Sequence, residues 1–283
     1  MSHWRHISVG YLLHLQNLVC EMKYPMLVIW SLSAVLISTT VQADTQAKFF
    51  NRIASFPVAS NLPADSMEKE SSAEIISATA DGNTLVYSDS PFQAIGLIDI
   101  SNPNMPEAAG TIKLDGEPTA VVVSGNTAYA AINTSTDYLD TSGKLVSINV
   151  ATAEIVNECM LDGQPDSIAV NAAGDRLAIA IENERDEDLN DGVIPQLPAG
   201  NVLLLDIDGT AINCDSFVAI DVSNRSSVAP SDPEPEFVDF NVDNQLVVSL
   251  QKIPVQNLNL FNCCQLHLAL RAPLPYHREA YWQ

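Results

Sequence analysis

The residues best suited to chemistry lie in one acidic stretch, "IENERDEDLNDGVIPQLPAGN", which runs from Ile181 to Asn201. Carboxylate and amide side chains crowd its first half, and proline and glycine follow. These carboxylates must lie in water or hold a cation, because burying an unpaired carboxylate is strongly unfavourable. Hard cations such as calcium prefer oxygen ligands of these types. We therefore predict a divalent-cation site, with calcium as the candidate ion, formed by Glu182, Glu184, Asp186, Asp188 and Asp191.

The spacing within this stretch matches a calcium-binding loop only in part. Asp186, Asp188 and Asn190 follow the alternate-residue pattern of such loops. Gly192 comes one position late, however, and Leu197 stands where the closing glutamate belongs. A solvated acidic rim that holds no ion is therefore the alternative interpretation.

The net charge of −22 over 283 residues is concentrated in one part of the chain. All acidic residues except Glu21 and Glu279 lie within residues 44–251. So acidic a surface repels nucleic acid and anionic membranes, and we expect neither as a partner. It suits a divalent cation or a basic partner, and the sequence leaves the oligomeric state open.

The histidines and cysteines argue against several common kinds of active site. All five histidines lie outside residues 44–251, which speaks against a serine or cysteine triad and against a histidine-based zinc site there. Cys159 and Cys214 are the two cysteines of that region. Neither has a His or Cys neighbour at the spacing of zinc ligands.

The beginning of the chain has the pattern of an export signal. Lys23 precedes an apolar run, and small residues up to Ala43 suit a signal peptidase. The run is shorter than the roughly 20 residues that span a bilayer. We predict a signal peptide at residues 22–43, a periplasmic or extracellular mature protein, and no stable membrane span after cleavage. Residues 1–21 are interpreted as a mis-called upstream extension.

An internal repeat organises residues 44–251. A turn with glycine or aspartate before an apolar strand recurs as "ADGNTLVYS" (80–88), "VSGNTAYAA" (123–131), "AAGDRLAIA" (172–180) and "NVDNQLVVS" (241–249). A second phrase follows the first three turns as "AIGLIDI" (94–100), "GKLVSINV" (143–150) and "GNVLLLDI" (200–207). A third precedes the last three turns as "GEPTAVVV" (116–123), "GQPDSIAV" (163–170) and "PEPEFVDFNV" (233–242).

Each repeat is typical of four short strands. A unit of about 40 to 50 residues with four strands is the pattern of a β-propeller blade. An all-β sandwich is the alternative, although a sandwich has no reason to repeat one phrase. We therefore predict an all-β fold, a β-propeller with four-stranded blades, and about four blades of a larger ring at the usual repeat length.

The predicted ring is incomplete at both ends. The segment "FFNRIASFPV" (49–58) has a strand pattern without a full blade before it, so we expect it to complete the last blade of a closed ring. After Gln251 the repeat and the acidity stop. Residues 252–283 are interpreted as an anomalous tail of the kind a frameshift produces, with a genuine C-terminal domain as the alternative. The chain is then a fragment of a larger protein.

Propeller geometry leads to two further expectations. In a propeller, the loops after second strands and the loops between blades lie on one face. Nine acidic residues of these loops should therefore meet around one mouth: Glu117, Asp166, Glu182, Glu184, Asp186, Asp188, Asp191, Glu234 and Glu236. Cys159 and Cys214 should both fall in outermost fourth strands, which diverge beyond the roughly 7 Å Cα limit for a disulfide. We therefore expect no bridge between them.

Several phrases together resemble a known family. They are "FFNRIASFPV", "DGNTLVYSDSP", "GEPTAVVV", "GQPDSIAV", "DPEPEFVDFN" and the acidic stretch itself. Over about residues 48–251 the chain resembles the propeller region of bacterial exported proteins of the choice-of-anchor or esterase-like phytase type. In such proteins "VSLQ" would run on as "ENNHI" into further blades, whereas here Lys252 begins unrelated sequence.

The resemblance implies an enzymatic alternative. Some proteins of this type are labelled alkaline phosphatases, which implies a calcium-dependent phosphoester hydrolase whose metals neutralise the phosphate and activate water. Arg185 is the one cationic side chain of the acidic stretch that could contact a phosphate, and no nucleophile motif accompanies it. The sequence therefore assigns no catalytic residue. The residues themselves favour an exported ligand- or cation-binding module.

Overall fold

The computed structural model describes residues 51–186, 188–226, 229–251 and 268–271. All of them belong to one compact unit, Asn51–Gln283. The predicted signal peptide, the extension before it and most of the predicted tail lie outside the described residues. In the described part of the chain, no helix has the length and apolar character needed to cross a membrane.

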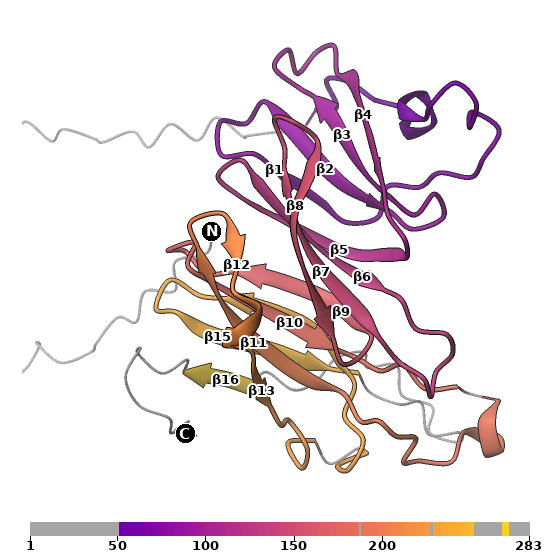
Figure 1. The fold of residues 1–283 in the computed structure, drawn as a ribbon, viewed down its shortest axis with the longest axis vertical. Coiled ribbons are helices and arrows are strands. Elements are labelled where there is room, and N and C mark those ends of the chain that lie inside the picture. The colour runs from indigo at the N-terminus through magenta and orange to yellow at the C-terminus, as the bar shows by residue number, and fades with distance from the viewer. Residues whose placement is uncertain (1–50, 187, 227–228, 252–267, 272–283) are drawn as a thin grey trace, which may run out of the picture. The chain divides into compact units, whose positions relative to one another are not determined.

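Antiparallel sheets hold most of the regular structure (Figure 1). The first sheet consists of β1 (Ile76–Ala78), β2 (Thr84–Asp89), β3 (Ala94–Asp99) and β4 (Glu107–Lys113). The second consists of β5 (Glu117–Ser124), β6 (Thr127–Asn133), β7 (Gly143–Asn149) and β8 (Glu154–Leu161).

Two further sheets follow in the chain. The third contains β9 (Pro165–Val170), β10 (Arg176–Ile181), β11 (Asn201–Asp208), β12 (Ala211–Ile212) and β13 (Val218–Ile220). The fourth contains β14 (Pro235–Phe240), β15 (Gln245–Leu250) and β16 (Leu268–Arg271). Short 3-10 helices lie between strands as η1 (Val58–Asn61), η2 (Leu189–Gly192) and η3 (Cys214–Ser216).

Strands that follow one another in the chain pair with one another in each sheet, except that β13 pairs with β11 and not with β12. The repeated turns join first to second strands, as the repeat predicts, and the Pro phrases begin β5, β9 and β14. The prediction of an all-β fold built from antiparallel sheets is confirmed; the first and second described sheets have four strands, the third has five and the fourth has three. Within the predicted tail, Leu268–Arg271 pairs with β15 and so extends the fourth sheet.

The middle sheets bury both of their faces. In β6, Tyr129 packs in the core shared with the third sheet, around Leu177, while Ile132 packs in the core shared with the first sheet, around Ile95. In β10, Leu177 faces the second sheet and Ala178 faces the fourth. Because alternate side chains of a strand point to opposite faces, strands covered on both sides need nearly continuous apolar sequence. The repeated runs of Ala, Val, Ile and Leu supply it.

The first strands of successive sheets lie against one another. Hydroxyl side chains join them. The amide of Val123 in β5 donates to Ser77 Oγ in β1 at 3.0 Å, and the amide of Val238 in β14 donates to Ser167 Oγ in β9 at 3.3 Å. Thr119 Oγ1 of β5 donates to the carbonyl of Pro165 in β9 at 2.9 Å. These contacts bring the beginnings of the first strands to one edge of the sheets.

The expected strand at residues 49–58 is wrong for its described part. Residues 51–57 form no strand, and η1 packs on the first sheet near β3 and β4. The reason lies in Asn61, which is buried and donates to Tyr87 Oη at 3.0 Å and to the carbonyl of Leu97 at 2.9 Å. Its Oδ1 accepts from the amide of Gly110 at 2.8 Å. This anchor holds the segment beside the first sheet.

The expectation of unpaired cysteines is also wrong, because Cys159 and Cys214 form a disulfide with a Cα–Cα distance of 5.6 Å. Cys159 does lie in the outer strand β8. Cys214 lies in η3, in a short excursion between β11 and β13. The excursion reaches back to β8, where the amide of Ile212 donates to Asn157 Oδ1 at 2.8 Å. The outer strands can therefore diverge while this inserted segment closes the gap.

Removing this disulfide should destabilise the protein. For the separation of 55 residues, the chain-entropy relation gives a loss of about 4 kcal/mol in the free energy of unfolding. Urea unfolding of a Cys159→Ala, Cys214→Ala double variant measures that loss. A reductant should weaken the unmodified protein and leave the variant unchanged, and a loss below about 1 kcal/mol would contradict a structural role for the bridge.

Candidate functional site

Five carboxyl groups from the third and fourth sheets act on one another electrostatically at the edge where first strands begin. Asp166 is the second residue of β9, Glu182 and Glu184 follow β10, and Glu234 and Glu236 flank the start of β14. We call these five residues the carboxylate cluster. Register explains the meeting, because Ile181 pairs with Pro165 and so places the end of β10 beside the start of β9.

The loop that follows β10 is fastened where it returns to the sheet. The amide of Gly200 donates to the carbonyl of Pro233 at 3.0 Å. A Cβ atom at Gly200 would lie 2.5 Å from the carbonyl oxygens of Ile181 and Glu182 and from Pro235 Cδ. Only glycine fits this approach without a shift of backbone. The chain entering β14 is thus held against the end of β10, beside Glu182.

Glu182 is the most unusual member of the carboxylate cluster. The residue is only 8% exposed, and no described residue donates a hydrogen bond to its carboxyl group. Burial first, and then the charges of Asp166, Glu236, Glu184 and Glu234, raise its pKa to about 9. The folded protein therefore keeps a proton on Glu182 at neutral pH.

Asp166 shows the same effects in a weaker form. Burial, followed by the charges of Glu236 and Glu184, raises its pKa to about 7. Burial also raises the pKa of Glu234, and the charge of Arg185 opposes that rise. The carboxylate cluster therefore carries more negative charge than its surroundings compensate, and protons take up part of the excess.

Arg185 is the cation that holds the entrance to β14. Its Nε donates to Asp232 Oδ2 at 2.8 Å, its Nη1 donates to Glu234, and its Nη2 donates to the carbonyl of Asp232. The Glu234 side chain also accepts from the Arg185 amide at 3.2 Å, and Asp232 accepts from the Gln196 amide at 2.8 Å. Asp232 and Glu234 are buried, and the Arg185 side chain is 9% exposed. The guanidinium is therefore fully engaged in the fold.

The structure divides the five residues of the predicted calcium site. Glu182 and Glu184 join the carboxylate cluster, whereas Asp186, Asp188 and Asp191 lie farther along the loop. None of these three is among the charges that act on Glu182 or Asp166. Asp188 and Asp191 are exposed around η2. The amide of Asp186 donates to Gln196 Oε1 at 2.9 Å, and Gln196 Nε2 donates to the Asp186 carbonyl at 2.8 Å.

Three members of the carboxylate cluster were absent from the predicted metal set. The sequence places these three residues, Asp166, Glu234 and Glu236, at the same mouth. The signal for them is their position in the repeat, because they adjoin Pro165 and Pro235, where first strands begin. Among the described residues, no group of three or more His, Cys, Asp or Glu side chains is arranged to hold a metal ion. The calcium site stays a prediction.

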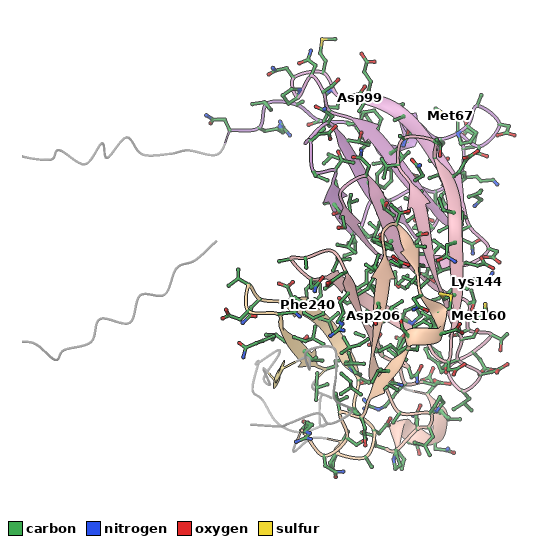
Figure 2. The ribbon with its side chains drawn as sticks, turned by 60° about the vertical axis from the view of Figure 1, so that its left-hand side comes forward. Met67, Asp99, Lys144, Met160, Asp206 and Phe240 are labelled. Atoms are coloured by element: carbon green, nitrogen blue, oxygen red, sulfur yellow. A yellow bond between two sulfur atoms is a disulfide. The ribbon has the colours of Figure 1, made fainter. Side chains whose placement is uncertain are left out.

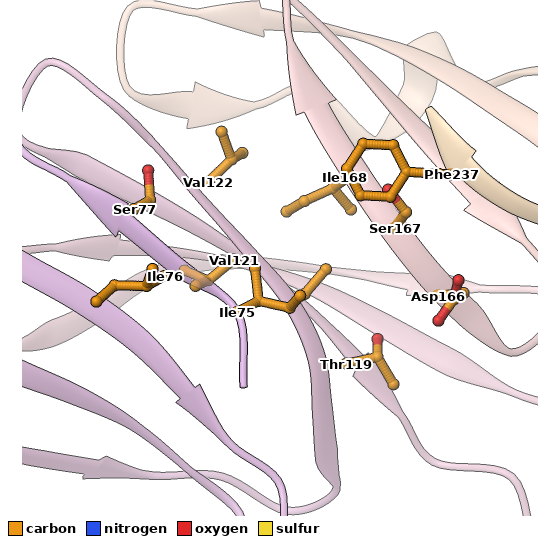
Figure 3. A pocket seen from close by; sticks show the side chains of 11 residues that line it. Ile75, Ile76, Ser77, Thr119, Val121, Val122, Asp166, Ser167, Ile168 and Phe237 are labelled. Carbon is orange, nitrogen blue, oxygen red and sulfur yellow. The ribbon is translucent and has the colours of Figure 1, made fainter. Parts of the chain in front are cut away.

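An apolar groove adjoins Asp166. It has a volume of about 270 Å³ and runs along the first strands of all the sheets. Figure 3 shows Asp166 on one side of it, with Phe237 above Ser167 and Ile168 and with Ile76 and Val122 across from them. Its lining residues are Ile75, Ile76, Ser77, Thr119, Ala120, Val121, Val122, Asp166, Ser167, Ile168 and Phe237.

A known protein family matches the part of the chain that contains these sheets. The family model of the choice-of-anchor I domain matches residues 74–253. The chain belongs to the choice-of-anchor I family. The matched residues include all of the carboxylate cluster and the first strand of every described sheet. No curated protein matches this choice-of-anchor I chain.

Solved structures give distant similarities. Hydrazine synthase of Kuenenia stuttgartiensis is 17% identical, with a TM-score of 0.46, over 70% of this chain and 49% of that one. A functionally unknown protein from Desulfotomaculum acetoxidans is 15% identical, with a TM-score of 0.36, over 52% of this chain and 46% of that one. The choice-of-anchor I chain thus spans about half the length of each.

The family and the disulfide both bear on the cellular location of the protein. Disulfides persist in oxidising compartments outside the cytosol, and Cys159 and Cys214 are joined. Together with membership of the choice-of-anchor I family, this indicates an exported protein.

Loss of Arg185 should be severely destabilising. Arg185→Gln leaves Asp232 and Glu234 buried without their counter-charge, which costs about 3 to 5 kcal/mol for such pairs. The control is Arg176→Gln, because Arg176 pairs with the exposed Asp206 and exposed pairs contribute about 1 kcal/mol or less. Urea unfolding measures both losses. Equal losses would show that burial of the Arg185 pairs contributes nothing beyond a surface contact.

Stability should fall as the pH rises, because Glu182 and Asp166 keep protons in the folded protein that the unfolded chain releases at lower pH. The stabilisation is complete below the ordinary pKa values and is lost as the pH rises through about 7 for Asp166 and about 9 for Glu182. Urea unfolding in a chelator at pH 5.5 and 8.5 measures the change.

Glu182→Gln should make that fall shallower, since the amide cannot ionise. At pH 8.5 the variant should exceed the unmodified protein by at least about 1.4 kcal/mol, the equivalent of one pKa unit. Asp188→Asn is the matched control on the exposed part of the loop and should keep the original pH dependence. An unchanged slope in Glu182→Gln would remove Glu182 as its source.

Proposed function

We propose that this chain is part of an exported β-propeller whose acidic edge binds a cation, in the periplasm or outside the cell. The propeller rests on three features of the described sheets. Consecutive strands pair in each sheet except that β13 pairs with β11, first strands lie against first strands, and the middle sheets are covered on both faces. Radially arranged blades of a propeller combine these features.

Cation binding rests above all on Glu182. Glu182 as a residue is 8% exposed and lies among other carboxyl groups, and no described residue donates a hydrogen bond to its carboxyl group. Its carboxyl oxygens are not among the fully buried atoms that lack a partner, so they keep some access to solvent through which an ion could reach them. A bound cation would replace the protons on Glu182 and Asp166 and relieve the repulsion within the carboxylate cluster.

Calcium is the cation that we propose to test first. Its preferred ligands are carboxylate, amide and carbonyl oxygens, and it accepts irregular geometry. Among the described residues no three of these side chains are arranged around a common metal position, so calcium binding would require them to draw together. Asp166, Glu182 and Glu236 would supply carboxylates from three different segments, and Glu184 would supply a fourth from the loop after β10. This set differs from the contiguous loop set predicted from the sequence. Substitutions at Glu182 and at Asp188 therefore distinguish the two sets.

The hydrolase alternative has less support. A phosphoester hydrolase needs cationic groups that face the phosphate, besides its metals. Arg185 was the candidate in the acidic stretch, but its guanidinium is engaged by Asp232 and Glu234. It could contact a phosphate only by leaving these buried carboxylates. We therefore favour a binding module over an enzyme.

Calcium should raise the melting temperature of the purified protein at pH 7.5. A tenfold excess over the dissociation constant adds about 1.4 kcal/mol, or about 3 to 6 °C for a domain of this size. Glu182→Gln should abolish the rise, and Asp188→Asn should keep it. The reverse result would favour the loop set of the sequence prediction. No rise in the unmodified protein would leave the acidic edge as a solvated rim.

Turnover of p-nitrophenyl phosphate, with and without calcium, separates the binding module from the hydrolase. We expect no turnover above the uncatalysed rate. Calcium-dependent turnover that Glu182→Gln abolishes would overturn the binding module in favour of the hydrolase.

A further inference from the structure

We propose that the groove along β1, β5, β9 and β14 binds a small organic cation, whose apolar body lies on the groove wall and whose ammonium group pairs with Asp166. This inference goes beyond a metal ion and rests on the proposed preference of the carboxylate cluster for cations. The groove joins that cluster to an apolar surface, and neither a metal ion nor an anion would use both.

The walls of the groove are apolar and open to solvent. Ile76 is 56% exposed and Phe237 is 58% exposed, although both are large hydrophobic side chains. They lie on opposite sides of the groove. Val122 lies on the side of Ile76, and Ile168 lies beside Phe237 (Figure 3). Grouped exposed apolar side chains mark binding surfaces more often than isolated ones do. A hydrocarbon chain or ring placed here would be covered from both sides.

The size of the groove limits the ligand. Its volume of about 270 Å³ lies just below the roughly 300 to 1,000 Å³ of typical small-molecule sites. A ligand with one ring or a short branched chain fits this space. The hydroxyl groups of Ser77, Thr119 and Ser167 also line the groove, but all three are used in bonds between first strands.

Asp166 sets the charge of the ligand, because it is the one charged residue among those that line the groove. No described residue donates a hydrogen bond to its carboxyl group. Glu182, Glu184 and Glu236 lie close enough to act on it electrostatically. An anion would be repelled by this group, and a neutral molecule would leave it uncompensated. An ammonium group supplies both the charge and the N–H donor that Asp166 lacks.

Glu182 lies close to Asp166 without itself lining the groove. The residue is 8% exposed, no described residue donates a hydrogen bond to its carboxyl group, and the charges of the other members of the carboxylate cluster act on it. Phe237 adds a second attraction, since the face of an aromatic ring attracts a cation within about 6 Å. An amphiphilic cation would use the ring and the aliphatic wall as well as the carboxylate, whereas calcium would use only oxygens.

The probe for this site is 2-phenylethylammonium, measured by isothermal titration calorimetry on the purified protein. The matched neutral probe is 2-phenylethanol, which has the same ring and chain, and the matched charge probe is methylammonium, which has no apolar body. We expect 2-phenylethylammonium to bind at least tenfold more tightly than either. Equal binding of 2-phenylethanol would overturn the role of Asp166, and equal binding of methylammonium would overturn the role of the groove.

Two variants assign the binding to this site. Asp166→Asn and Phe237→Ser should each weaken 2-phenylethylammonium binding at least tenfold, and Asp188→Asn should leave it unchanged. Phe237 is exposed, so its replacement should preserve the fold, which the melting temperature checks. Phe237→Ser should also keep the calcium-induced rise in melting temperature. Unaltered probe binding in both Asp166→Asn and Phe237→Ser would overturn the proposal.

The calcium experiment separates failure of this inference from failure of the proposed function. A calcium-induced rise without any binding of 2-phenylethylammonium would overturn the organic-cation site and leave the cation-binding edge intact. Absence of both would overturn the two proposals together.

Discussion

Burial of both faces of the middle sheets is the constraint on which the rest of the structure depends. A sheet whose strands are apolar on both faces would expose apolar surface to water if one face were left uncovered, so it packs between two other sheets. The alternation within β6 and β10 assigns each face to a different neighbour. Stacking of the sheets then brings their first strands together, and with them every residue that begins a first strand.

The concentration of acidic residues at one edge follows from that stacking. Antiparallel strands in chain order place the end of each second strand beside the start of the first strand, as the pairing of Ile181 with Pro165 shows. The acidic stretch after β10 and the acidic start of β14 therefore meet, although they are far apart in the chain. Water must leave this junction when the sheets pack, and the carboxyl groups that remain are the ones whose pKa values rise.

Two local devices hold the junction in place. Arg185 compensates Asp232 and Glu234 at the entrance to β14, and Gly200 lets the returning loop approach the end of β10. At the opposite, outer side, the disulfide between Cys159 and Cys214 joins the second sheet to the third. Figure 2 shows Met160 of β8, beside this bridge, on the outer strand. The junction between sheets is thus fixed at its inner edge by charge and at its outer edge by a covalent bond.

The sequence by itself determined the strands of the repeat, because their length and apolar pattern are local properties and the repeat supplies the same evidence several times; the segment before the repeat, where that evidence is missing, forms no strand over residues 51–57. It also determined that the acidic residues share one edge, since this follows from strand order. Only the tertiary structure decided which carboxyl groups meet. Asp166 and Glu236 join Glu182 through the packing of β9 and β14, whereas Asp188 stays on the loop despite its suitable spacing. The disulfide and the anchoring of Asn61 depend likewise on where an excursion turns back, which no repeat encodes.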